Sequence, residues 1–496
     1  MTTELIHIRA IHKVVGYLLA IEASVLALCS LIPLYTRESD MFAFLASSLI
    51  TACFSVLFIL FGKNENSRES LSRRDGYLVV VLSWTLFSLF GCLPFIISRY
   101  IPNFTNAFFE TISGFTTTGA SIVGNVEILP HGLLFWRSLT QWMGGLGIVF
   151  FTVAVLPFFG VGEVQLFAAE AIGPAHGKLH PRIGVSGRWI LTLYVMLTVS
   201  CAIVLNICGM GFFDSVNHAM TTIATSGYST RNASIGAFHS VLIEDVITIF
   251  TFLSGINFSL LFLLFFKGKI GKLLHDTEFL YYLGCTLGLS LVLGIVITAN
   301  TQNSLRESLH LASFQVISML TTTGFVTNDV YNWPAPVYMI LSVAMCLGAC
   351  AGSTTGGMKG VRSVILFRSL KNEANRILHP NAVLPVRVNG KVVPETTRQT
   401  IFTFTVCYVA LIAISWIIYI IAGLNMSDAF YAATAFISNS GTAVGSFDAA
   451  NSFDTTLSWD ILSTGAKWYT CFLMLVSRLE IFAVLLIFTP AFWRKA

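Results

Sequence analysis

The chain has 496 residues and a formal net charge of +4, and 55% of its residues are hydrophobic while only 11% are charged. Soluble domains usually carry about 25% charged residues, so this composition excludes an ordinary water-soluble protein and indicates that lipid covers most of the surface. The small net charge does not suggest a nucleic-acid partner. The ten cysteines lie mostly in apolar stretches and have neither a metal-binding nor a disulfide-framework spacing.

Apolar segments long enough to cross a bilayer as helices recur along the chain. The first is followed by several others, so we interpret it as a retained helix rather than a signal peptide. In chain order, the ten expected spans are 14–35, 41–62, 76–98, 131–159, 187–210, 238–266, 278–299, 335–358, 399–423 and 467–492.

Basic residues gather in alternate connections between these spans. They follow the second, fourth, sixth and eighth spans, as Lys63, Arg68, Arg73, Arg74, Lys178, Arg182, Arg188, Lys267, Lys269, Lys272 and the stretch 359–398. The other connections hold scattered arginines and, late in the chain, several aspartates, namely Arg37, Arg99, Arg231, Arg306, Asp428, Asp448, Asp454 and Asp460. Because positively charged loops stay on the cytoplasmic side, we expect both termini in the cytoplasm.

Four of the outer connections contain a short, half-apolar segment followed by a Thr/Ser–Gly cluster. Each glycine lies twelve residues after a small residue, in the segments 107–121, 215–229, 312–326 and 429–443. The stretch between the two makes about three helical turns and is too short to span. Each connection must therefore enter the membrane and return to the same side. The four glycines are Gly119, Gly227, Gly324 and Gly441.

This recurrence predicts an all-α polytopic membrane protein. Four pseudo-repeats of helix, pore helix with filter loop, and helix are expected around one pore, preceded by an extra transmembrane hairpin. The expected units are the hairpin at 1–75 and the repeats at 76–186, 187–277, 278–398 and 399–496.

The residue types in the four loops suit a potassium filter. Backbone carbonyls and Thr or Ser hydroxyls can replace the hydration shell of a monovalent cation, and glycine permits the positive φ that aims successive carbonyls at one axis. The absence of an Asp or Glu ring argues against a divalent site. A single Thr-Gly cluster would be an ordinary turn, but four at one spacing favour a filter. Glu110, on the first short helix, is interpreted as a supporting residue.

The predicted filter residues are Thr117, Thr118, Gly119, Ser226, Gly227, Thr322, Thr323, Gly324, Ser440 and Gly441. Within this set, K⁺ is expected at Thr118, Gly119, Ser226, Gly227, Thr323, Gly324, Ser440 and Gly441.

Two further features are unusual for membrane spans. The eighth span runs into GACAGSTTGGMKG (348–360), whose five glycines should break the helix into a loop below the filter. Arg478 lies deep in the last span, where a charge needs a wet cavity or a partner. Pairing with Glu480 is one reading, but residues two apart lie on different helix faces. The carbonyls of the broken eighth span are the better partner.

The stretch AVLPVRVNGKVVPE (382–395) contains Asn389-Gly390 between alternating valines, which predicts a β-hairpin with a type I′ turn. A stable surface turn and a docking site for a partner remain equally open.

Taken together, these motifs resemble the Trk/Ktr/HKT superfamily of potassium transporters, specifically the bacterial TrkH type of pore subunit. The resemblance rests on motifs spread over most of the chain, namely FTTTGA (115–120), QWMGGLGI (141–148), TTTGF (321–325), AGSTTGGMKG (351–360), HPNAVLPVRVNGKVVPE (379–395) and SRLE (477–480). It implies uptake of potassium across the bacterial inner membrane by a homodimer with one pore in each subunit. A glycine at the first filter favours K⁺ over Na⁺.

The resemblance also assigns a gate and a partner. The gate would comprise Gly348, Gly352, Ser353, Thr354, Gly356, Gly357, Lys359 and Arg478. A cytoplasmic ring of TrkA-type nucleotide-binding subunits would regulate it. No GxGxxG or P-loop motif occurs in the chain, so no organic cofactor is expected here and a nucleotide would act only through that ring. The second and fourth filters, TSGYS and NSGTA, depart from TTTG, and Thr442 after the fourth glycine is unexpected.

The main alternatives are a cation/proton symporter and a Na⁺-permeable transporter. Carriers often use inverted repeats, whereas the four segments here share one orientation. An intramembrane enzyme is not expected, because neither GxSxG nor HExxH occurs.

Overall fold

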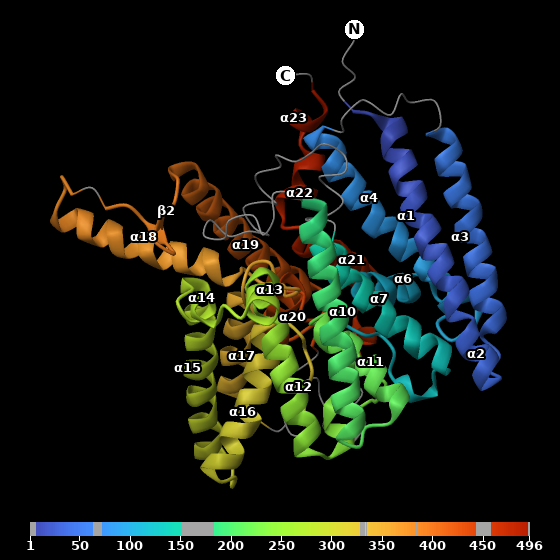
Figure 1. The fold of residues 1–496 in the computed structure, drawn as a ribbon, viewed down its shortest axis with the longest axis horizontal. Coiled ribbons are helices and arrows are strands. Elements are labelled where there is room, and N and C mark those ends of the chain that lie inside the picture. Colours follow the sequence, from blue (N-terminus) through green and yellow to red (C-terminus); the bar gives the residue numbers. More distant parts are fainter. Residues whose placement is uncertain are drawn as a thin grey trace.

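The computed structural model describes residues 6–62, 72–150, 183–327, 333, 335–382, 384–442 and 458–494, and these are mostly helical (Figure 1). Among the described residues, six helices are long and apolar enough to cross a membrane, and two bent pairs pass the same criterion when each is counted as one span. The basic residues Lys63, Arg68, Lys178 and Arg182, the aspartates Asp448 and Asp454, and the end of the expected span 131–159 lie outside the described residues.

The N-terminal hairpin consists of two long helices that pack along each other at one side of the molecule (Figure 1). Small residues allow this close approach, since the Ser55 hydroxyl donates to the carbonyl oxygen of Gly16 at 2.7 Å. A Cβ at Gly16 would lie 2.9 Å from the backbone nitrogen of Ile59, so only glycine fits there. The helices are α1 (Ile8–Cys29), the short α2 (Leu31–Thr36) and α3 (Met41–Phe61).

The next part of the chain introduces the first short, buried helix. Ser72 and Asp75 form a capping box at the start of the preceding long helix, and Asn103 caps the short helix. The elements are α4 (Arg73–Gly91), α5 (Leu93–Ile97), α6 (Phe104–Phe115), η1 (Val126–Ile128) and α7 (His131–Phe150).

In the second part, the single helix expected over 238–266 is wrong. Two helices meet there at 105°, because Gly255 ends the first and the side chain of Asn257 caps the second by accepting from the Ser259 amide. The elements are α10 (Ile183–Ile207), α11 (Phe212–Ile223), η3 (Ser234–Phe238), α12 (Val241–Ser254), α13 (Phe258–Lys267) and α14 (Ile270–Leu274).

The third part contains the predicted break and the predicted hairpin. The helix that begins the eighth expected span ends at Leu347, and the next begins at Gly360 and extends away from the bundle (Figure 1). The two strands pair antiparallel around Asn389 and Gly390, whose φ angles of 49° and 77° match a type I′ turn. The elements are α15 (Thr277–Asn300), α16 (Leu305–Leu320), α17 (Ala335–Leu347), α18 (Gly360–Leu378), β1 (Arg387–Val388) and β2 (Lys391–Val392).

In the fourth part, the single helix expected over 467–492 is broken as well. The chain turns by 113° after Arg478, where Glu480 and Ile481 have positive φ angles of 61° and 53°. Positive φ is rare for a β-branched residue, and it ends the helix here. The elements are α19 (Glu395–Ile421), α20 (Met426–Ile437), η5 (Trp459–Ile461), α21 (Thr464–Arg478), α22 (Phe482–Leu485), η6 (Leu486–Phe488) and α23 (Pro490–Trp493).

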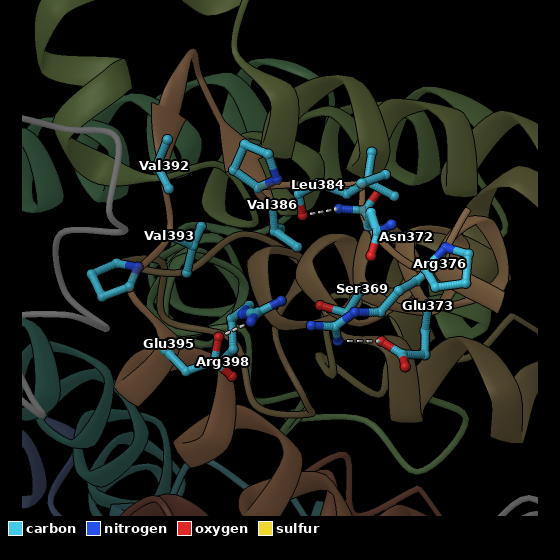
Figure 2. Close-up of a pocket in the computed structure, with 15 residues that line it drawn as sticks. Ser369, Asn372, Glu373, Arg376, Leu384, Val386, Val392, Val393, Glu395 and Arg398 are labelled. Atoms are coloured by element: carbon cyan, nitrogen blue, oxygen red, sulfur yellow. Dashed lines mark hydrogen bonds and ion pairs between the residues drawn. The ribbon is translucent and has the colours of Figure 1, made fainter. Parts of the chain in front are cut away.

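A pocket of about 500 Å³ separates α18 from the hairpin and the start of α19 (Figure 2). Its two arginines are neutralised by glutamates on their own helices, Arg376 by Glu373 and Arg398 by Glu395. Across the pocket, the Asn372 side chain donates to the Leu384 carbonyl at 3.0 Å and ties the segment before the hairpin to α18.

Candidate functional site

The four short helices α6, α11, α16 and α20 end in the same turn. In each, the amide of the residue before the glycine donates to a carbonyl five positions earlier, at 2.8–3.1 Å, through the amides of Thr118, Ser226, Thr323 and Ser440. The residue two positions before each glycine has a φ of 51–56°, at Thr117, Thr225, Thr322 and Asn439. Non-glycine residues rarely adopt positive φ, and such conformations cluster at functional sites. The same strained turn therefore occurs four times.

The small residues that begin the twelve-residue spacing explain how four short helices fit into the core. Each has no measurable exposure to solvent, at Ala107, Ser215, Ala312 and Ala429. A larger side chain at these positions would separate helices that are packed on all sides.

The four glycines form a closed cycle of close contacts. A Cβ added to Gly119 would collide with the carbonyl oxygen of Ser226, and the same relation joins Gly227 to Thr323. It continues from Gly324 to Ser440, and then from Gly441 back to Thr118. The residue preceding each glycine thus presents its carbonyl to the glycine of the previous loop. The loops consequently surround one centre, with no room for a side chain at the glycine positions.

Hydroxyl groups around this ring are held by side chains rather than left free. The Thr118 hydroxyl lies 2.8 Å from that of Thr116 and accepts from the Asn439 amide at 2.9 Å. The Ser226 hydroxyl donates to Gln141 Oε1 at 2.7 Å. Among the described residues, no group of three or more His, Cys, Asp or Glu could hold a metal ion. The ring offers a cation neutral oxygens only.

The fourth loop differs in detail. Gly441 has a φ of 55°, whereas the other three ring glycines have values of 79–84°. Its carbonyl oxygen accepts from the indole nitrogen of Trp459 at 2.8 Å. The hydroxyl of Thr442, the residue that departs from the expected filter pattern, lies 3.0 Å from that of Tyr431 in the same segment. This contact holds the Thr442 side chain in place.

A buried ion pair supports the first two loops. Glu110 Oε1 lies 2.8 Å from Arg137 Nε, and Glu110 also accepts from the Ile122 amide at 2.9 Å. Arg137 donates in turn to the Ser229 carbonyl and lies 4.2 Å from the ring centre of Tyr228. The pair therefore ties the chain beyond Gly119 to the chain beyond Gly227. This contact agrees with the interpretation of Glu110 as a supporting residue.

Sequence reasoning missed two supporting residues, Arg137 and Gln141. Gln141 accepts from the Tyr228 amide at 3.0 Å and donates to the Ser226 carbonyl at 3.1 Å. Both lie within an expected apolar span, where polar groups are rare and usually functional. Their position in that span was the available signal.

The glycine-rich segment 348–360 lies across the helix ends of the ring. The Thr354 hydroxyl donates to the Ile223 carbonyl at 3.1 Å and accepts from the Thr225 hydroxyl at 3.1 Å. The amide of Gly356 donates to the Thr322 hydroxyl at 2.7 Å, and that of Gly357 to the Ser438 carbonyl at 3.1 Å. The segment therefore contacts the second, third and fourth loops at once.

Two buried cations bind carbonyls of this segment. Arg478 Nη1 donates to the Thr354 carbonyl at 3.0 Å, as the sequence indicated, and Lys359 Nζ donates to the adjacent Thr355 carbonyl. Glu480 does not pair with Arg478 but with Arg362, at 2.7 Å. The two cations thus donate to adjacent backbone carbonyls of the segment.

The bend between α12 and α13 holds the first half of the segment, a contact that sequence reasoning did not foresee. The Cys350 amide donates to the Gly255 carbonyl at 3.0 Å, and the Asn257 side chain donates to the Ala351 carbonyl at 2.6 Å. Breaking the helix exposes backbone groups, and the segment satisfies them.

Comparison with known proteins identifies a family over most of the chain. A family model described as "TrkH: Cation transport protein" matches residues 41–495. The Trk system potassium uptake protein TrkH of Salmonella typhimurium is 37% identical over 493 residues, covering 99% of this chain and all of that protein. The Trk system potassium uptake protein TrkG of Escherichia coli K12 is 32% identical over 495 residues, covering 99% of both chains.

A solved structure is similar as well. The crystal structure of the potassium transporter TrkH from Vibrio parahaemolyticus matches with a TM-score of 0.87 at 32% identity, covering 98% of this chain and all of that one.

Proposed function

This chain belongs to the TrkH family of cation transport proteins, and we propose that it takes up potassium by letting K⁺ permeate through the ring of four loops. It is a membrane transport protein and not an enzyme. The observation that carries the proposal is the closed cycle in which each ring glycine abuts the carbonyl of the next loop.

The ring suits a monovalent cation for electrostatic reasons. Carbonyl dipoles from four loops can replace the hydration shell of K⁺ without a formal charge that would trap it. In this proposal K⁺ is held by Thr118 and Gly119 and by the matching residues of the other three loops: Ser226, Gly227, Thr323, Gly324, Ser440 and Gly441. The pair of Glu110 and Arg137 supports this arrangement by holding the chain beyond Gly119 against the chain beyond Gly227. Rb⁺, which resembles K⁺ in charge and hydration, should also pass.

The segment 348–360 serves as the gate in this proposal. Its hydrogen bonds to three loops support a position across the pathway, and Arg478 and Lys359 place two cations on its carbonyls. A permeating K⁺ would meet both a steric obstacle and electrostatic repulsion there. Opening requires these hydrogen bonds to break together, and Gly348, Gly352 and Gly357, all at positive φ, permit the backbone to rearrange.

The working assembly is proposed to be a homodimer with one pore in each subunit, in the bacterial inner membrane, with both termini cytoplasmic. The basic stretch 359–398 supports this orientation by the positive-inside rule. The exposed hairpin and the pocket beside α18 would then face the cytoplasm, where a TrkA-type ring that binds the nucleotide could reach them.

Ion flux in proteoliposomes tests the function. We expect uptake of K⁺ and Rb⁺ well above that of Na⁺, unchanged when a proton gradient is imposed or collapsed. Equal Na⁺ uptake would overturn the selectivity, and uptake that depends on the proton gradient would establish a cation/proton symporter instead.

A further inference from the structure

One carboxylate oxygen holds both ends of the segment 348–360. Glu278 lies in the first turn of α15 and is only 4% exposed. Its Oε1 accepts from the Ala351 amide at 2.6 Å and from the Val361 amide at 2.9 Å. These two amides flank the part of the segment that bonds to the loops. A single side chain therefore bonds to the backbone on both sides of that part.

The chemistry of this contact makes it a sensitive point. Hydrogen bonds to an ionised acceptor are about twice as strong as those between neutral groups. Removing the carboxylate would leave two buried amides without this acceptor. The segment would keep its bonds to Asn257, Lys359 and Arg478. It would lose the carboxylate that accepts from the backbone on both sides of the loop contacts.

The tip of the β-hairpin is attached to the same helical turn. The Asn389 side chain accepts from the Thr277 amide at 2.8 Å and donates to Asp276 Oδ2 at 2.6 Å. Asp276 is the N-cap of α15, and its Oδ1 accepts from the amides of Glu278 and Phe279 at 3.0 and 2.9 Å. The hairpin thus contacts the two residues that immediately precede Glu278.

We propose that Glu278 is a positioning residue for the segment 348–360, and that Asn389 positions Glu278 through Asp276 and Thr277. A displacement of the hairpin is then transmitted to the segment across the ring. The hairpin is suited to receive such an input, because Gly390 and Val392 at its surface are exposed, Val392 by 56%. The effect on ion flux rests on the proposed gate, whereas the positioning itself does not.

The turn alone does not explain Asn389. Its φ of 49° would suit glycine or aspartate in a type I′ turn. Asn389→Gly therefore keeps the turn and removes the side-chain contacts with α15, while the backbone amide at this position still donates to the Thr277 hydroxyl. Asn389→Asp also keeps the turn, but it replaces the amide donor by a carboxylate facing Asp276.

Alkylation of Cys350 reports the position of the segment without measuring transport. Cys350 lies in the segment and has no measurable exposure, and Cys471 in α21 is a buried control with 2% exposure. We expect Glu278→Ala to speed alkylation of Cys350 about tenfold, measured by peptide mass spectrometry, with Cys471 unchanged. Glu278→Gln, which keeps an acceptor oxygen, should have a smaller effect. Unchanged Cys350 alkylation in a folded Glu278→Ala protein would overturn the proposal.

The hairpin is tested by combining variants. Asn389→Gly and Asn389→Asp should each speed Cys350 alkylation less than Glu278→Ala does. Combining either Asn389 variant with Glu278→Ala should not speed Cys350 alkylation beyond the rate of Glu278→Ala alone, because both substitutions act through Glu278. Additive effects, or no effect of either Asn389 variant, would overturn the role of the hairpin. The Asn389 variants keep the test available if Glu278→Ala does not fold.

Measuring K⁺ flux for the same variants separates the positioning of the segment from its role as a gate. Raised Cys350 alkylation with raised K⁺ flux supports the positioning and the gate together. Raised alkylation with unchanged flux supports the positioning and removes the gating role from the proposed function.

Discussion

Arg478 donates a hydrogen bond from Nη1 to the carbonyl oxygen of Thr354 at 3.0 Å. The same Thr354 bonds through its hydroxyl to the second loop of the ring. One residue of the segment 348–360 therefore links the intramembrane arginine to the turn before a ring glycine. The proposed gate depends on this link.

Replacing Arg478 by alanine should raise K⁺ flux by about tenfold or more, because a hydrogen bond from a charged donor contributes about 1.5–3 kcal/mol and a positive charge leaves the pathway. Flux in proteoliposomes measures this. The matched control is Arg376→Ala, since Arg376 is exposed on α18 and pairs only with Glu373 among the residues described. A fall in uptake with the protein folded and in the membrane would make Arg478 structural.

Gly119→Ser should admit Na⁺. The added side chain collides with the Ser226 carbonyl and forces a ring oxygen to move. We expect the K⁺/Na⁺ permeability ratio to fall about tenfold, equivalent to about 1.4 kcal/mol of lost discrimination. Gly124→Ser is the control, because a Cβ there meets nothing within 4 Å. An unchanged ratio in Gly119→Ser, measured by bilayer recording, would refute the filter assignment at this loop.

Deleting part of 350–357 should give a pore that leaks without regulation. The deletion removes the contacts of Thr354, Gly356 and Gly357 with three loops, while the ring contacts among the glycines do not depend on them. Flux should therefore rise while K⁺ selectivity is retained. If the unregulated rate is unaltered in liposomes, the segment is not a gate.

Arg137→Leu should destabilise the protein by about 3–5 kcal/mol, because it leaves the Glu110 carboxylate buried without its partner. Thermal unfolding measures the loss. Adding Glu110→Gln should recover part of it, since the remaining buried group is then neutral. A double variant no more stable than Arg137→Leu alone would show that the pair contributes little through its charge.

The four glycine loops could be located from the sequence because each carries its signal locally. In each loop a Thr-Gly or Ser-Gly pair ends twelve residues after a small residue, and the turn that it adopts uses hydrogen bonds within the same segment. The break before residue 348 and the hairpin at Asn389 were also predicted, since glycine content and turn chemistry are local. Arg137 and Gln141 were not, because a polar residue in an apolar span signals a partner without telling where in the chain that partner lies.

The bends after Ser254 and Arg478 were missed for a related reason. Both segments are apolar enough to read as straight spans, and hydropathy does not register a helix that is broken to bond with another part of the chain. The backbone groups exposed at the first bend are satisfied by the segment 348–360, which lies about a hundred residues later in the sequence. Only the folded chain brings those partners together.

The sequence by itself determined that this is a polytopic helical membrane protein with four glycine loops, because lipid demands long apolar helices and each Thr/Ser–Gly cluster follows a small residue at the same distance. The tertiary structure decided how the loops relate to one another. Each ring glycine is needed because a carbonyl from a different loop occupies the space of its Cβ. Likewise, Glu278 connects the hairpin to the segment across the ring only because chain segments distant in sequence meet at its carboxylate and at the residues before it.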